Sequence, residues 1–206
     1  NEAKAQFEKA RELPLTEQWR CPQGHPVRVT DGTNDYLHFF LPEGPVRVPA
    51  LLAAVLDPAG YQALSCVGHA PDQITRDAAG QPVWSWSTNR EPLTQKAEHK
   101  LIEGGALKIE EARFQFHDAE TGKPVNMHGG SVSWNAFRKR WILVAVQQGG
   151  TSFLGEVWYA EADSPTGPWG KATKIVTHDR YSFYNPVQRP FFDQDGGRLI
   201  YFEGTY

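Results

Sequence analysis

One stretch of this sequence recurs further along the chain without a gap. Residues 132–143 (VSWNAFRKRWIL) align at an offset of 58 with residues 190–201 (PFFDQDGGRLIY), and Arg140 falls on Arg198. Each copy is an apolar or aromatic run, a polar turn, an arginine and a second apolar run, which is the pattern of a β-hairpin. Two matching hairpins in one chain indicate that the fold is assembled from repeated units.

The first half of the chain contains weaker copies of this unit. Residues 27–40 and 74–86 each place two strand-like runs around a polar turn. A second hairpin element recurs as well, because residues 160–169 resemble residues 55–61 with a proline and a glycine at matching places in the turn. Each unit therefore contains two hairpins, or four strands.

Repeated four-stranded units predict an all-β fold, and in particular a β-propeller. A β-sandwich also gives evenly spaced short strands, but the recurrence of whole hairpin pairs favours the propeller. About three and a half blades are expected, with these approximate bounds: 27–67, 70–125, 126–178 and a fourth that begins at 185–206.

The ends of the chain differ from this pattern. Residues 1–20 are expected to form a helix and linker, since the segment from Ala3 to Arg11 is rich in Ala, Glu and Lys. Residues 21–206 then form a partial propeller domain. The chain starts at Asn1 rather than Met and stops at Tyr206 in a strand-like run, so we expect the missing blades to lie outside it.

Charge and hydropathy exclude two classes of partner. The formal net charge is −3, which provides no electrostatic attraction for nucleic acid. No apolar run approaches the roughly 20 residues of a membrane-spanning helix, so no membrane partner is expected. The charged stretch from Lys96 to Phe116 is interpreted as an extended outer hairpin or an insertion without an assigned function.

Three histidines occupy similar places in successive units. His25, His69 and His128 each come just before the first strand of a blade, which lines the central channel of a propeller. Imidazoles there could bind a metal, hydrogen-bond a sugar or carry protons, or they could only cap turns at the blade boundaries. Cys21 and Cys66 precede two of them, but the spacing does not match zinc motifs. We therefore assign no metal and expect no cofactor.

Two carboxylates are candidates for catalysis. Asp72 lies at the start of an inner strand, and Glu203 lies in an apolar run where burial would raise its pKa and suit it to act as a general acid. Glu203 could instead be a structural partner of Arg189 or Arg198. The fourth inner strand adds three candidates for ligand binding: Asn185, Gln188 and Arg189.

Part of the chain resembles a known family. Residues 162–169 (ADSPTGPW) resemble a strand-and-turn element of five-bladed glycoside hydrolases of the arabinanase and β-xylosidase type, and the preceding WILVA run is similar to their second blade strand. Residues 128–132 and 201–206 are similar to segments of an uncharacterised bacterial family of this shape. The resemblance is best from about 126 to 206.

This resemblance implies a five-bladed propeller that acts on a polysaccharide or oligosaccharide at its channel, in a secreted or periplasmic location. A hydrolase would use two channel carboxylates about 5–10 Å apart. The family's three acidic residues are not matched residue by residue in this sequence. A non-catalytic propeller that binds a glycan or a protein partner is therefore the alternative.

Overall fold

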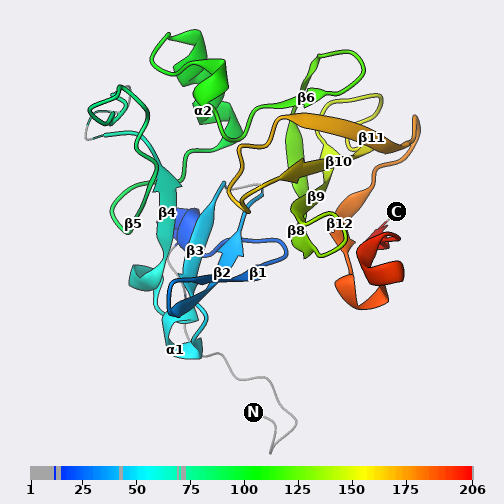
Figure 1. Ribbon diagram of the computed structural model, residues 1–206, viewed down its shortest axis with the longest axis horizontal. Coiled ribbons are helices and arrows are strands. Elements are labelled where there is room, and N and C mark those ends of the chain that lie inside the picture. The colour runs from blue at the N-terminus through cyan, green and yellow to red at the C-terminus, as the bar shows by residue number, and fades with distance from the viewer. Residues whose placement is uncertain (1–11, 13–14, 42–43, 69, 71–72, 206) are drawn as a thin grey trace, which may run out of the picture.

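The protein is built mostly of β-strands, as the sequence predicts. The computed structural model contains two large sheets that lie side by side, with helix α2 (Gln95–Glu103) at one end and a small two-stranded sheet beside the second large sheet (Figure 1). The helix predicted from Ala3 to Arg11 lies outside the described residues. The structure describes these residues: 12, 15–41, 44–68, 70 and 73–205.

The first sheet is an antiparallel meander in which every strand pairs with the next one along the chain. Gly32 takes a positive φ of 61° in the tight turn between the first two strands, a conformation that glycine adopts without strain. A short helix, α1 (Leu52–Val55), and 3-10 helices at Leu15–Arg20 and Pro58–Gly60 accompany this sheet. Its strands are β1 (Val27–Asp31), β2 (Asn34–Phe39), β3 (Val46–Pro49), β4 (Gln62–Ser65) and β5 (Ser85–Ser87).

The second sheet has six strands in the order β7-β6-β11-β10-β9-β8 and is strongly curled (Figure 1). Four consecutive strands, β8 to β11, form an antiparallel meander, while β6 runs parallel to β11 and pairs with β7. The strands are β6 (Phe116–Asp118), β7 (Pro124–Val125), β8 (Met127–Asn135), β9 (Arg140–Gln147), β10 (Glu156–Ala162) and β11 (Lys171–Thr177).

Residues 70–125, expected to form a blade, make no sheet of their own in the described part of the chain. Strand β5 extends the first sheet, and β6 and β7 extend the second. Along the chain, α2 and a 3-10 turn at Ile109–Glu111 come between β5 and β6. The hydroxyl of Thr94 caps α2 by accepting a hydrogen bond from the backbone N–H of Ala97 at 3.2 Å. The charged stretch interpreted as a hairpin or insertion is therefore largely this helix and the turn after it.

The two repeated hairpins differ in regularity. Strands β8 and β9 pair up to a tight turn. Strands β12 (Tyr184–Gln188) and β13 (Phe202–Thr205) also pair with each other, but they flank residues 190–201. Between β12 and β13 the chain forms 3-10 turns at Pro190–Phe192 and Asp195–Gly197, and an isolated bridge between Gln194 and Leu199 closes the second turn. Proline lacks an N–H and the second turn contains positive φ angles, so residues 190–201 do not form the regular hairpin that the alignment predicts.

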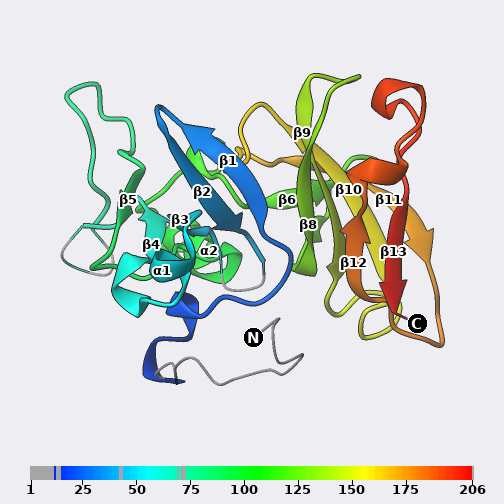
Figure 2. The ribbon, with the colours of Figure 1, turned by 90° about the horizontal axis from the view of Figure 1, so that it is seen from below.

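One edge strand from each of the three sheets (β1, β8 and β12) lies next to the following one across the molecule (Figure 2). His25, just before β1, bridges to Ser131 of β8 in parallel fashion. The hydroxyl of Ser131 accepts a hydrogen bond from the backbone N–H of Gln188 at 2.8 Å, which joins β8 to β12. A hydrophobic core between the large sheets includes Phe40 and Leu64 of the first and Leu143 and Trp158 of the second, among others.

Candidate functional site

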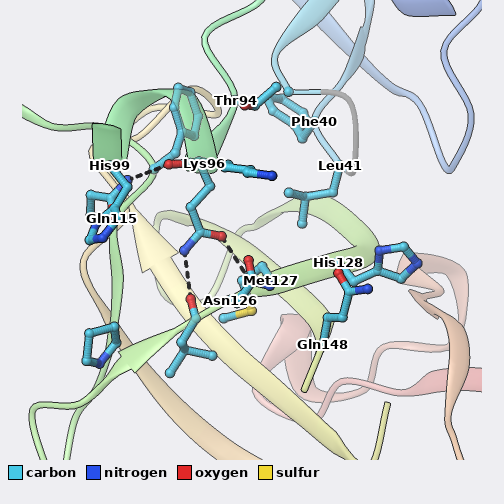
Figure 3. A pocket seen from close by; sticks show the side chains of 15 residues that line it. Phe40, Leu41, Thr94, Lys96, His99, Gln115, Asn126, Met127, His128 and Gln148 are labelled. Atoms are coloured by element: carbon cyan, nitrogen blue, oxygen red, sulfur yellow. Dashed lines mark hydrogen bonds between the residues drawn. The ribbon is translucent and has the colours of Figure 1, made fainter. Parts of the chain in front are cut away.

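A pocket of about 660 Å³ opens where the first sheet, the start of α2 and the β7–β8 segment meet. Its floor is apolar, because Phe40, Phe114, Val125 and Met127 are all buried. Figure 3 shows Phe40, Leu41 and Thr94 on one side, with the segment Asn126–His128 and Gln148 opposite. Polar side chains surround this floor: Thr94, Gln95, Lys96, His99, Gln115, Asn126, His128 and Gln148.

Gln95 fixes the helix against the second sheet. Its side-chain Nε2 donates to the carbonyl of Val125 at 2.7 Å, and its Oε1 accepts from the backbone N–H of Met127 at 3.0 Å (Figure 3). Both ends of this amide are therefore occupied by backbone groups. Gln95 therefore holds the pocket together, and only one amide N–H and one oxygen lone pair of its side chain are not used by these two bonds.

Glu98 fixes part of the pocket lining through hydrogen bonds to residues 113–115. It is fully buried, and its carboxylate accepts hydrogen bonds from the backbone N–H groups of Arg113 at 2.6 Å and Phe114 at 2.9 Å. Burial raises the pKa of Glu98, and these bonds oppose that shift. The Nε2 of Gln115 donates to Glu98 and to the carbonyl of Gln95, so the Gln115 carbonyl oxygen is the group that remains for a ligand.

Four rim side chains have no hydrogen-bond or ion-pair partner among the described residues. Two of them belong to Asn126 and Gln148. These residues are neighbours, because the backbone N–H of Gln148 donates to the carbonyl of Asn126 at 2.9 Å. His128, which the sequence singled out, is the third and lies at the start of β8. Lys96, on the first turn of α2, is the fourth. The rim therefore offers amide, imidazole and ammonium groups that a ligand can engage.

Three other predicted residues line a second pocket instead. His25, Gln188 and Arg189 line a smaller pocket of about 310 Å³ between the start of β1, β8 and β12. The Nε2 of His25 is buried without a hydrogen-bond partner in the described structure. Burial lowers the pKa of His25, the Arg189 charge lowers it further, and Glu203 acts in the opposite direction. His25 and His128 therefore line two different pockets.

Glu203 is engaged by an arginine. Its Oε1 accepts hydrogen bonds from Nε of Arg189 at 2.8 Å and from a terminal nitrogen of the same guanidinium at 2.5 Å. The Glu203 side chain is 58% exposed, so it is not the buried carboxylate that the apolar run around it predicts. The alternative interpretation of Glu203, as a structural partner of Arg189, matches this geometry.

The remaining predicted residues divide between structural positions and undescribed ones. Gln188 is buried and its Nε2 donates to Asp193 at 2.8 Å, while its Oε1 accepts from the hydroxyl of Ser133, so it joins β12 to β8. Asn185 is exposed and takes a positive φ of 48°. His69 and Asp72 lie outside the described residues.

The two cysteines do not form a metal site with the described histidines. Cys21 is exposed and Cys66 is buried, and burial raises the pKa of the Cys66 thiol to about 11. Within the described ranges, no group of three His, Cys, Asp or Glu side chains could hold a metal ion. Both cysteines are free thiols in the structure.

Sequence reasoning missed most of the pocket. Lys96 and His99 lie in the charged stretch that the sequence pattern leaves without a function, although Thr94 followed by strong helix formers is a recognisable helix start. Gln115, Asn126 and Gln148 carry no local signal, because each is a single polar residue next to a strand. Only their meeting around one apolar floor distinguishes them.

Comparison with known proteins adds no assignment. No protein-family model matches this chain, and no curated protein or solved structure matches it significantly. In the part of the chain that the structure describes, no helix has the length and apolar character needed to cross a membrane.

Proposed function

We propose that this chain binds a carbohydrate in the pocket between its two large sheets. The observation that carries the proposal is an apolar floor beneath a rim of polar side chains without protein partners. A sugar ring has an apolar C–H face and hydroxyl groups at its edge, so it needs both kinds of surface at once. Ligand pockets commonly combine an apolar lining with a few polar groups that fix orientation.

Binding fits this pocket better than hydrolysis. Cleavage of a glycosidic bond uses two carboxyl groups placed on either side of the bond. The described lining residues include no Asp or Glu, and Glu203 lies elsewhere, bonded to Arg189. We therefore favour a glycan-binding module over a glycoside hydrolase.

We also propose that the two large sheets are blades of a β-propeller. Each sheet has extra strands at its outer edge, β5 in the first and β6 and β7 in the second. The support is that β1 to β4 and β8 to β11 are four-stranded antiparallel meanders and that β1, β8 and β12 are neighbours. Innermost strands meet in this way around a propeller axis. In this arrangement β12 and β13 would open a further blade.

A glycan array followed by calorimetric titration tests the proposed function. We expect Gln148→Ala to weaken binding of the selected glycan about five- to tenfold, since one net hydrogen bond contributes about 1 kcal/mol. Gln81→Ala is the matched control, because Gln81 is also exposed but does not line the pocket. A protein that binds no glycan, or two variants that behave alike, would overturn the proposal. Release of reducing sugars by the wild type would instead support a hydrolase.

A further inference from the structure

The pocket rim carries positive charge that the surrounding protein does not balance. Lys96 projects from α2 on the side of the pocket where Phe40 and Leu41 lie (Figure 3), and its ammonium has no ion-pair partner among the described residues. His99 and His128 add two imidazoles to the same rim. The whole chain has a formal net charge of −3, so this feature does not reflect a generally basic protein.

The two carboxylates of α2 are engaged elsewhere. Glu98 is buried beneath the pocket and is bonded to the backbone N–H groups of Arg113 and Phe114. Glu103 lies at the far end of α2, where one of its oxygens is 3.4 Å from Nε2 of His99. Neither carboxylate forms an ion pair with Lys96, so its charge remains available to a ligand.

Besides this charge, the rim carries groups that can form hydrogen bonds with the hydroxyls of a ligand. The amide side chains of Asn126 and Gln148 can each donate and accept, and the Gln115 carbonyl oxygen can accept. An ammonium and several amides around one apolar floor match a ligand with one anionic group, several hydroxyls and an apolar face. A neutral sugar would leave the exposed Lys96 ammonium with water as its partner, whereas an anionic group would gain a charge-assisted hydrogen bond there.

We infer that the ligand is an acidic saccharide, a uronate whose carboxylate pairs with Lys96 while its hydroxyls bond to Asn126, Gln148 and Gln115. This inference rests on the proposed carbohydrate-binding function. It adds the class of sugar and the residue that selects it. His128 and His99 then border the ligand without being its main anion partner.

A matched pair of ligands tests the inference: a galacturonate oligosaccharide and its fully methyl-esterified form, which differ in charge. We expect the wild type to bind the acid about tenfold more tightly at low salt, with the preference shrinking as salt is added. Lys96→Gln should lose this preference and retain its affinity for the ester. Lys100→Gln, on the same helix but outside the pocket, should behave as the wild type.

Each outcome separates this inference from the function on which it rests. Equal binding of acid and ester would overturn the inference and leave carbohydrate binding intact. Binding of neither ligand, nor of any glycan on the array, would overturn both. Tighter binding of a sulfated oligosaccharide than of the uronate would refute the assignment to a carboxylate. An unchanged acid preference in Lys96→Gln would refute the role of that residue.

Discussion

His38 allows a quantitative test of the packing of the first sheet. It lies in β2, its exposed fraction is 3%, and neither ring nitrogen has a hydrogen-bond partner among the described residues. Aromatic rings surround it, with the Trp86 centroid at 5.1 Å and the Phe40 centroid at 5.9 Å. Burial lowers the pKa of His38 to about 4, and the charge of nearby Arg47 contributes to the shift.

This shift makes the free energy of unfolding depend on pH in a defined direction. A histidine in the unfolded chain has a pKa of about 6.5, so it takes up a proton as the pH falls while the folded His38 does not. The unfolded state is therefore favoured progressively between about pH 6.5 and pH 4. The cost is about 2 kcal/mol at pH 5 and about 3 kcal/mol near pH 4.

Urea denaturation at pH 7, 6 and 5 measures this effect against the variant His38→Leu. Leucine cannot be protonated and leaves no unsatisfied ring nitrogen, so we expect it to be at least as stable as histidine at pH 7. Between pH 7 and pH 5 the wild type should lose about 2 kcal/mol more than the variant. His25 also has a lowered pKa, but it is present in both proteins and cancels in the comparison.

Gln81→Leu, an exposed change that removes no titratable group, serves as the control and should keep the wild-type pH dependence. Parallel curves for the wild type and His38→Leu would refute the reasoning, because they would mean that His38 can be protonated in the folded state. A large loss of stability in His38→Leu at pH 7 would show that the ring nitrogens have partners after all.

Two further predictions concern β8 and β13. Gly130→Ala should destabilise the protein by about 2 kcal/mol or more, since a Cβ there would lie 2.3 Å from the carbonyl oxygen of Val144. Gly129→Ala, whose Cβ would approach Asn185 only to 3.7 Å, should unfold in urea close to the wild type, and equal losses would contradict this packing. Glu203→Gln should lower stability by less than about 1 kcal/mol, because its ion pair with Arg189 is exposed. A loss of several kcal/mol in thermal unfolding would place that carboxylate in the interior.

The sequence by itself determined the strands whose signals are local. Alternating apolar residues around polar turns predict the hairpin within residues 27–40 and the longer one at 132–143, and both form in the structure. These elements need only neighbouring residues, since side-chain alternation and turn geometry act over a few positions. The same signals predict the all-β class.

Two predictions from local sequence patterns are wrong, the hairpin at residues 190–201 and the blade at residues 70–125, and each has a physical cause. Residues 190–201 align with a hairpin but contain Pro190 and positive φ angles at Asp195, Gly196 and Gly197, which interrupt the ladder. The division of residues 70–125 between two sheets follows from long-range strand pairing. Such pairing depends on which edges are free in the folded molecule.

The candidate site is a product of tertiary structure. Its lining comes from the end of β2, the start of α2, the segment before β6, and the β7–β8 and β9 ends. The Gln95 side chain brings two of these segments together through the backbone of Val125 and Met127. Whether His38 faces the interior and Glu203 faces solvent was likewise decided by packing. Alternation along a strand places residues on opposite faces, but only the neighbouring elements decide which face is covered.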